Sequence, residues 1–270
     1  MIKMIAGLVS TNDSIEKRFN RASLGKITHL PDYNIRPGDH TLFLSSSKAN
    51  EFKTFRYGMV RSGTNEERLL FEIPIEAPWR KIHDEHILRK DIISSPDFRK
   101  HIRGQRGLMP VDYFIVETEK DPCVIFMRNK QRPFALGCIW DAWKKNILDD
   151  LTFGFAILTV PAYGIFKQIG IERMPLIIPE DHYQEWVDPD PTIMSKTKLM
   201  DYYPEEYLDA FPISNEILTS RENLKSLISP VGNRLIIEKE EKLILNSKRK
   251  KRSSDEFKIT LGERNELTGK

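Results

Sequence analysis

Short apolar segments alternate with polar turns along most of the chain, a pattern that is typical of half-buried and buried strands. Glycine, proline and acidic residues separate these segments. The pattern predicts four strands in the first part of the chain and six in the middle. They cover residues 5–9, 41–45, 52–60, 68–75, 107–109, 113–117, 123–127, 134–140, 155–160 and 176–178.

Helical periodicity is limited to short stretches. We expect helices at 14–19, at 82–93, at 96–102 after Ser95 and Pro96, near Trp143 and over 180–187. The first helix has three candidate caps, which are Asn12, Asp13 and Ser14. Residues 32–39 are expected to form a loop around Pro37 and Gly38.

The order of these elements shows no regular alternation of strand and helix, which argues against a doubly wound parallel sheet. We therefore predict an α+β protein whose sheets are mostly antiparallel. The expected domain covers residues 1–228, and an extension at 229–245 follows it as either a hairpin or a helix.

Composition supports a folded chain: 40% of the 270 residues are hydrophobic and 30% are charged. The longest apolar stretch, residues 153–166, contains Pro161 and is shorter than the roughly 20 residues that a membrane span needs. We expect no membrane segment and no secretory signal. Cys123 and Cys138 are the only cysteines, which favours a reducing, cytoplasmic setting.

Positive charge is concentrated at the end of the sequence. Residues 246–270 carry eight basic and four acidic residues, a net charge of +4, while residues 1–245 have a net charge of −1. Because this segment has few large apolar residues, we predict a disordered basic tail. It is either a solvated, non-specific tail or an arm that contacts nucleic-acid phosphates.

General catalytic motifs are absent from the sequence. It has no phosphate-binding glycine loop and no nucleophile elbow. The run His83, Asp84, Glu85 and His86 is more typical of a surface turn than of a metal site. We therefore expect no metal and no cofactor.

Seven short segments, in order, resemble the SOS-response-associated peptidase (SRAP) family. Among them, Tyr33-Asn34-Ile35-Arg36-Pro37-Gly38 resembles the family's YNIAPG loop, and Arg173-Met174-Pro175 resembles the end of its HDRMP motif. The seven segments are 32–39, 56–60, 106–112, 133–140, 156–163, 173–178 and 211–214. The resemblance implies one domain with a barrel-like core flanked by short helices. It also implies recognition of abasic sites in single-stranded DNA as part of the DNA damage response.

In active members of this family, a cysteine follows the initiator methionine, and its amine and thiol both react with the abasic-site aldehyde. This sequence has Ile2 at that position, or Ile5 if Met4 is the start. The family's asparagine falls near Glu76, and its arginine falls on Pro78.

Two further family site residues are replaced. The glutamate falls on Val116, although Glu117 is adjacent, and the histidine falls on Ile171. Isoleucine cannot transfer a proton, so we expect a catalytically inactive member with Glu117 and Glu76 as weak catalytic candidates. Glu117 could serve only if a bulge shifted the strand register.

Six residues lie at positions that resemble family positions lining the DNA groove, with Tyr57 in place of the family's tryptophan. Arg173 suits either a bidentate phosphate contact or a salt bridge at the edge of the core, and Tyr57 suits either stacking on a base or plain packing. The six predicted DNA-binding residues are Asn34, Pro37, Arg56, Tyr57, Thr159 and Arg173.

The sequence leaves several functions open. The first is non-covalent binding of single-stranded DNA by a monomer, at abasic sites, which would place the protein at the nucleoid. The second is a repurposed scaffold that binds a protein partner, because Glu76 would repel phosphates. A different enzyme built on Glu76, Glu117, Glu172 or the pair His83 and His86, and DNA cross-linking by an altered route, are the others.

Overall fold

A computed structural model describes the chain over residues 4–20, 23–46, 51–60, 68–76, 91–128, 132–144, 146, 149–189, 197–201, 203–204 and 207–235. Contacts divide the chain after Leu235, and every described residue belongs to the first unit. Residues 82–90 of the expected 82–93 helix lie outside the described residues, as do Pro78, the run from His83 to His86 and the basic tail. The remaining residues of that helix, 91–93, form a 3-10 helix.

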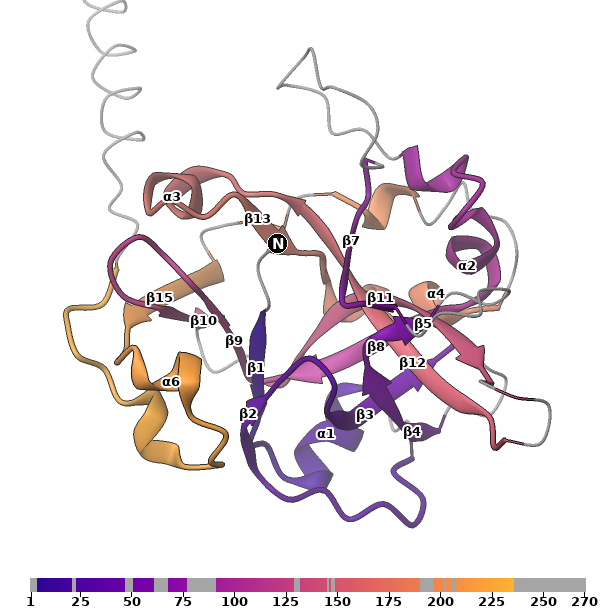
Figure 1. Ribbon diagram of the computed structural model, residues 1–270, viewed down its shortest axis with the longest axis horizontal. Helices are drawn as coiled ribbons and strands as arrows, with labels where there is room; N and C mark the ends of the chain where they lie inside the picture. Colours follow the sequence, from indigo (N-terminus) through magenta and orange to yellow (C-terminus); the bar gives the residue numbers. More distant parts are fainter. Residues whose placement is uncertain are drawn as a thin grey trace, which may run out of the picture. The chain divides into compact units, whose positions relative to one another are not determined.

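A five-stranded antiparallel sheet includes the first strand of the chain (Figure 1). Its strand order is β15-β10-β9-β1-β2. The bounds are β1 Ile5–Leu8, β2 Asp32–Ile35, β9 Tyr113–Val116, β10 Cys123–Met127 and β15 Leu208–Pro212.

A second sheet closes on itself, because β12 pairs with both β4 and β11. The closed ring runs β12-β4-β3-β8-β11 and forms a five-stranded barrel, with β7, β13 and β14 attached to it. The bounds are β3 His40–Ser45, β4 Phe52–Tyr57, β7 Glu72–Pro74, β8 Arg106–Val111, β11 Phe134–Trp143, β12 Thr152–Pro161, β13 Arg173–Pro175 and β14 Ile177–Ile178. A separate two-stranded pair joins β5 Met59–Val60 to β6 Leu69–Leu70.

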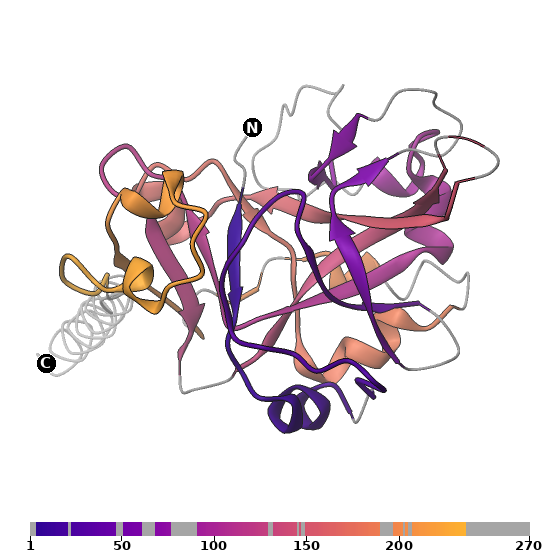
Figure 2. The same ribbon diagram turned by 60° about the horizontal axis from the view of Figure 1, so that its bottom comes forward.

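The helices are short and lie around the sheets (Figures 1 and 2). His101 on α2 hydrogen-bonds to Asp141 on β11 at 2.9 Å, which ties that helix to the barrel. The α-helices are α1 Asn12–Arg18, α2 Arg99–Gly104, α3 Gly164–Gln168, α4 Tyr183–Val187 and α6 Glu216–Thr219. The 3-10 helices are η1 Asp91–Ile93, η3 Glu180–His182, η4 Thr197–Leu199 and η6 Lys225–Ile228.

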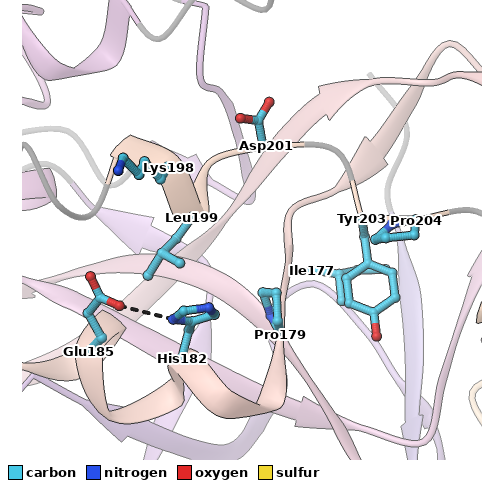
Figure 3. A pocket seen from close by; sticks show the side chains of 9 residues that line it. All are labelled: Ile177, Pro179, His182, Glu185, Lys198, Leu199, Asp201, Tyr203 and Pro204. Carbon is cyan, nitrogen blue, oxygen red and sulfur yellow. Dashed lines mark hydrogen bonds and ion pairs between the residues drawn. The ribbon is translucent and has the colours of Figure 1, made fainter.

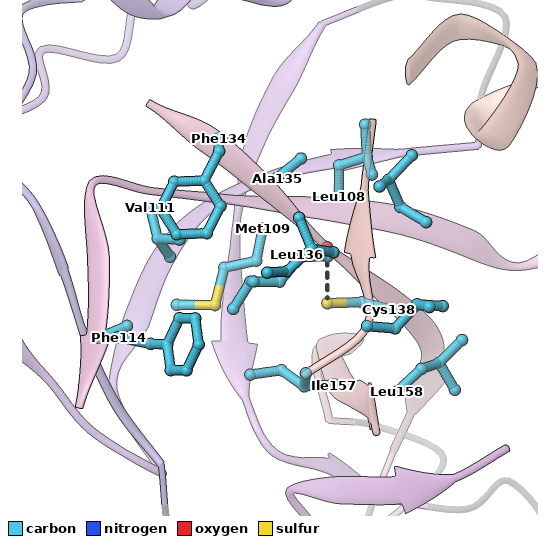
Figure 4. Packing of buried hydrophobic residues seen from close by; sticks show 14 of the residues in the cluster. Leu108, Met109, Val111, Phe114, Phe134, Ala135, Leu136, Cys138, Ile157 and Leu158 are labelled. Carbon is cyan, nitrogen blue, oxygen red and sulfur yellow. Dashed lines mark hydrogen bonds between the residues drawn. The ribbon is translucent and has the colours of Figure 1, made fainter. Parts of the chain in front are cut away.

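The main hydrophobic core fills the barrel and continues onto one face of the five-stranded sheet. Figure 4 shows β8, β11 and β12 side chains packed around Cys138, whose thiol donates to the Leu136 carbonyl oxygen at 3.4 Å. Phe114 of the five-stranded sheet packs edge to face against Phe134 of the barrel. The sheet's other face forms a smaller cluster with Ile217 of α6 and Leu227 of η6.

The α+β class with mostly antiparallel sheets and a barrel core is confirmed, but some local expectations were wrong. Trp143 ends strand β11 rather than lying in a helix. Residues 32–35 form β2, and Thr11 rather than Asn12, Asp13 or Ser14 caps α1. Gly58 divides the expected 52–60 strand into β4 and β5, because its φ of 138° departs from strand conformation. Residues with side chains rarely adopt this φ, which explains the glycine at this position.

The last described segment packs on the five-stranded sheet. Pro230 forms an isolated bridge with Ile213, and Leu235 forms one with Ala210 of β15. Among the described residues, no helix is both long and apolar enough to cross a bilayer.

Candidate functional site

The end of strand β12 brings together three residues that are far apart in the sequence. β7 runs parallel to β12, with Pro74 beside Thr159, and β13 runs antiparallel on β12, with Pro175 beside Thr159 and Arg173 beside Pro161. Glu76 lies just beyond β7. The two flanking strands therefore place the side chains of Glu76 and Arg173 next to Thr159.

Arg173 uses several of its donors within this group. Its Nη2 lies 2.8 Å from Glu76 Oε2 and 2.9 Å from the Thr159 carbonyl oxygen, while its Nε donates to Thr159 Oγ1 at 2.9 Å. The side chain of Glu76 is only 5% exposed, against 28% for Arg173. The second carboxylate oxygen of Glu76 is buried and has no hydrogen-bond partner among the described residues.

Glu72 on β7 adds a second carboxyl group. Its Oε1 accepts a hydrogen bond from the backbone N–H of Met4 at 3.1 Å, so the residue preceding β1 meets this group. Burial raises the pKa of the Glu72 carboxyl, against the opposing effects of the Met4 N–H and of Arg173. Glu72 thus stays protonated to a higher pH than an ordinary glutamate does.

Tyr57 lies in the core near Glu72. Its ring is fully buried and stacks on Phe155, with 5.4 Å between ring centroids. Burial raises the Tyr57 pKa well above its ordinary value, and the charge of Glu72 adds to this. The hydroxyl group has no hydrogen-bond partner among the described residues.

These groups form one set at the end of β12. We call the Met4 amide together with Tyr57, Glu72, Glu76, Thr159 and Arg173 the polar cluster.

The residues at the other expected catalytic positions are apolar. Val116 and Ile171 are each 2% exposed and belong to the main core, as Met4 does. β1 and β9 pair with Ile5 opposite Ile115, so continuing the register places Met4 beside Val116. Glu117 follows β9 and is exposed, and β9 pairs with β10 without a register shift up to Val116. The bulge that Glu117 would need is therefore missing from this described pair.

The remaining predicted DNA-binding residues lie in two other places. Asn34 is buried, and its side-chain amide donates to the carbonyl oxygens of Ser220 and Glu222. Pro37 lies in the turn before β3, where the Gly38 N–H donates to the Tyr57 carbonyl oxygen. Arg56 is half-buried and pairs with Gly154 near the start of β12, five residues from Thr159.

The structure thus unites Thr159, Arg173 and Glu76 in the polar cluster with Tyr57, but it places Asn34, Pro37 and Arg56 elsewhere. Five residues along a strand correspond to about 16 Å, so the backbone of Arg56 lies far from Thr159 and its partners Glu76 and Arg173. The buried ring of Tyr57 packs against Phe155, so in this conformation it does not offer a face to a base. Glu72 was not among the site residues expected from the sequence. Its signal was a carboxylate inside an otherwise apolar strand segment.

The two thiols lie in the core. Cys123 is 5% exposed at the start of β10, and Cys138 is fully buried in β11. Burial raises the Cys123 pKa to about 11, with a further contribution from Asp121, and raises the Cys138 pKa well above its ordinary value. Both thiols are therefore protonated near neutral pH and are poor nucleophiles.

A concave surface lies beside η3, α4 and η4 and encloses about 290 Å³ (Figure 3). His182 and Glu185 on its wall pair with each other at 3.0 Å. Its other labelled residues include Lys198, Asp201 and Tyr203. None of the predicted site residues lines it. Over the described ranges, no group of three or more metal-binding side chains occurs.

Comparison with known proteins supports one family. A curated relative is the abasic site processing protein YoaM of Bacillus subtilis (strain 168), 24% identical over 206 residues, covering 74% of this chain and 85% of that protein. A solved protein of Bacteroides thetaiotaomicron superposes with a TM-score of 0.69 at 17% identity and covers 84% of this chain and 99% of its own.

A second solved protein, from Bordetella bronchiseptica, superposes with a TM-score of 0.60 at 18% identity, covering 78% of this chain and 99% of its own. At these identities the solved structures show the shared fold alone. The family model described as SOS response associated peptidase (SRAP) matches residues 6–220. The chain therefore belongs to the SRAP family.

Proposed function

We propose that this SRAP protein binds single-stranded DNA at abasic sites without forming a covalent bond. The observation that carries the proposal is the polar cluster, in which Arg173 pairs with Glu76 and Glu72 accepts the Met4 N–H just before β1. The family match and the likeness to an abasic site processing protein supply the substrate class. The cluster has groups that can bind a sugar-phosphate but lacks the groups that would react with it.

The residues present support the proposed absence of covalent chemistry. A thiazolidine needs an amine and a thiol on the same residue, and Met4, Ile5 and Ala6 at the start of β1 carry no thiol. Cys123 and Cys138 are buried and have raised pKa values. Val116 and Ile171 cannot move a proton. The cluster therefore supports recognition rather than cross-linking.

Arg173 is the expected phosphate contact. The described residues supply partners for its Nε and Nη2, which leaves Nη1 for a phosphate oxygen. Glu72, with its raised pKa, can donate a hydrogen bond to a sugar oxygen when it is protonated. Glu76 opposes binding, because its carboxylate lies beside the position that a phosphate would take.

The test is equilibrium binding of the full chain to a labelled single-stranded oligonucleotide, with and without one abasic site, at two salt concentrations. We expect tighter binding to the abasic strand and no protein–DNA band on a denaturing gel after boiling. Arg173→Gln should reduce affinity for both strands by several-fold, whereas the exposed control Arg99→Gln on α2 should not.

Two results would contradict this proposal. A band that survives boiling would show cross-linking by an altered route. An absence of DNA binding at both salt concentrations would favour a second candidate function, binding of a protein partner. The observation behind that candidate is the Glu76–Arg173 ion pair, which already neutralises the arginine that DNA would need.

A further inference from the structure

Three arginines converge on the five-stranded sheet, on the face opposite to the main core and at the end opposite to Met4. Phe126 of β10 pairs with Asp209 of β15 and with Tyr113 of β9. Arg132 lies 5.2 Å from the Phe126 ring centroid, and Arg234 lies 5.0 Å from it. We call Arg128, Arg132, Arg234, Phe126 and Asp209 the arginine cluster.

The strand registers separate this cluster from the polar cluster. Tyr113 pairs with Gly7, whereas Met4 of the polar cluster lies beyond the other end of β1. Phe126 and Tyr113 belong to the smaller hydrophobic cluster, on the sheet face opposite to the main core that contains Met4 and Val116. A ligand at the arginine cluster therefore occupies its own site.

The cluster has more positive charge than its single carboxylate can neutralise. Asp209 is buried, and its Oδ2 lies 3.4 Å from Arg128 Nε and also pairs with Arg234. Its Oδ1 accepts the Ala210 N–H at 2.9 Å. One carboxylate oxygen thus serves two guanidinium groups, and Arg132 brings a third, which leaves a formal local charge of +2.

Arg128 also has donors without an acceptor. Its Nε and Nη2 are buried atoms that make no hydrogen bond among the described residues. The Nε lies 3.4 Å from Asp209 Oδ2, which is an ion-pair contact without hydrogen-bond geometry. A buried charged donor without an acceptor is unfavourable, because it has lost its hydrogen bonds to water. A tetrahedral anion with several oxygens satisfies such donors and balances the excess charge.

We infer that the arginine cluster is a phosphate-binding site, and that its phosphate is a backbone phosphate of a nucleic-acid strand. This source rests on the proposed function, since DNA is the polyanion that the protein is proposed to bind. Arg132 and Arg234 are exposed, with a 50% exposed side chain for Arg234, so a strand can reach them. The contact is to phosphate and carries no base preference.

The first experiment measures binding of an undamaged and an abasic single strand over a range of salt concentrations. The variant Arg128→Gln/Arg132→Gln/Arg234→Gln is compared with Arg99→Gln/Lys100→Gln/Arg103→Gln, which removes the same charge from exposed positions of α2. The cluster variant should bind both strands more weakly by an equal factor. Its slope of log K against log salt should fall by about 0.7 for each phosphate that the variant no longer binds.

The second experiment titrates inorganic phosphate into the full chain and follows the melting temperature. Phosphate should raise the Tm of the wild type and of the α2 control, and should raise it less in Arg132→Gln. That single variant keeps both partners of Asp209, so it is expected to fold even if the triple variant does not.

The two experiments separate the two proposals. Stabilisation by phosphate that depends on Arg132, without binding of any single strand, would support the phosphate site and contradict its nucleic-acid source and the proposed function. DNA binding with the same salt slope in the cluster variant as in the α2 control would overturn the inference and leave the proposed function standing. Equal phosphate stabilisation of Arg132→Gln and wild type would also overturn it.

Discussion

The polar cluster and the arginine cluster both place guanidinium groups beside buried carboxyl groups, but in opposite proportions. The polar cluster has Glu72 and Glu76 around one arginine, Arg173. The arginine cluster has three arginines around one carboxylate, Asp209. In the first, an incoming phosphate must compete with a carboxylate for the arginine, whereas in the second it adds missing negative charge.

This difference separates two tasks that a DNA-binding protein has to perform. General attraction to the backbone depends on excess positive charge, and under the proposed function the arginine cluster supplies that charge. Selection of one position on the DNA strand depends on a site that binds only a nucleotide whose shape and charge match it. The polar cluster, with its buried and partly neutralised groups, suits selection better than attraction.

The largest expected effect is on stability when the arginine of the polar cluster is removed. Arg173→Ala leaves the buried carboxylate of Glu76 without its counter-ion, and should lower the free energy of unfolding by about 2 to 4 kcal/mol. Urea denaturation measures this loss. The double variant Glu76→Leu/Arg173→Met should restore most of it, because no buried charge then lacks a partner. A loss below about 0.5 kcal/mol would show that Glu76 is effectively solvated.

The next effect is on DNA binding when the competing carboxylate is neutralised. Glu76→Gln keeps the shape of the side chain but removes a repulsion of about 1 kcal/mol or more toward a nearby phosphate. Affinity for single-stranded DNA should therefore rise by about fivefold or more. Glu119→Gln, in an exposed loop, is the matched control. Unchanged affinity in the Glu76 variant would mean that no phosphate approaches Arg173.

A pH effect follows from the raised pKa of Glu72, whose main cause is burial. Between the ordinary carboxyl pKa of 4.5 and the raised native value, the folded state binds more protons than the unfolded state does. This group therefore stabilises the fold below pH 4.5 relative to higher pH, and its contribution is lost as pH rises through the native pKa. Glu72→Gln should flatten this decline in denaturation midpoints measured from pH 4 upward. An identical decline in both proteins would contradict the assignment.

The smallest expected effect is on stability when one arginine of the arginine cluster is removed. The side chain of Arg234 is 50% exposed, and Asp209 keeps Arg128 as a partner. Arg234→Gln should therefore change the free energy of unfolding by less than about 1 kcal/mol. A loss as large as that of Arg173→Ala would show that the arginines of this face serve the fold, and would remove the contrast between the two clusters.

Much of the fold could be predicted because its strands are strongly patterned. The apolar segments that became β10, β11 and β12 lie close to their expected positions, and the α+β class followed from their order. Short elements were missed where the local signal was small. β13 has only three residues and is held by pairing with β12, so its strand conformation depends on its neighbour rather than on its own sequence.

The candidate site was only partly predictable. Thr159, Arg173 and Glu76 were singled out in the sequence, and the structure brings them together. Arg56 and Tyr57 were placed in the same groove, but the register of β4 on β12 puts Arg56 at the far end and buries the Tyr57 ring. Similarity of short motifs identifies strand ends and turns, but it does not determine which side chains reach one another.

The sequence by itself determined the residue types available at each position: no thiol at the start of β1, an isoleucine at 171, a valine at 116 and a glutamate at 76. Those identities already limited the chemistry. The tertiary structure alone decided that Glu72 meets the Met4 amide, and that Arg128, Arg132 and Arg234 converge on Phe126 and Asp209. These contacts arise from pairing between strands distant in the chain, and local hydrophobic periodicity carries no information about such pairing.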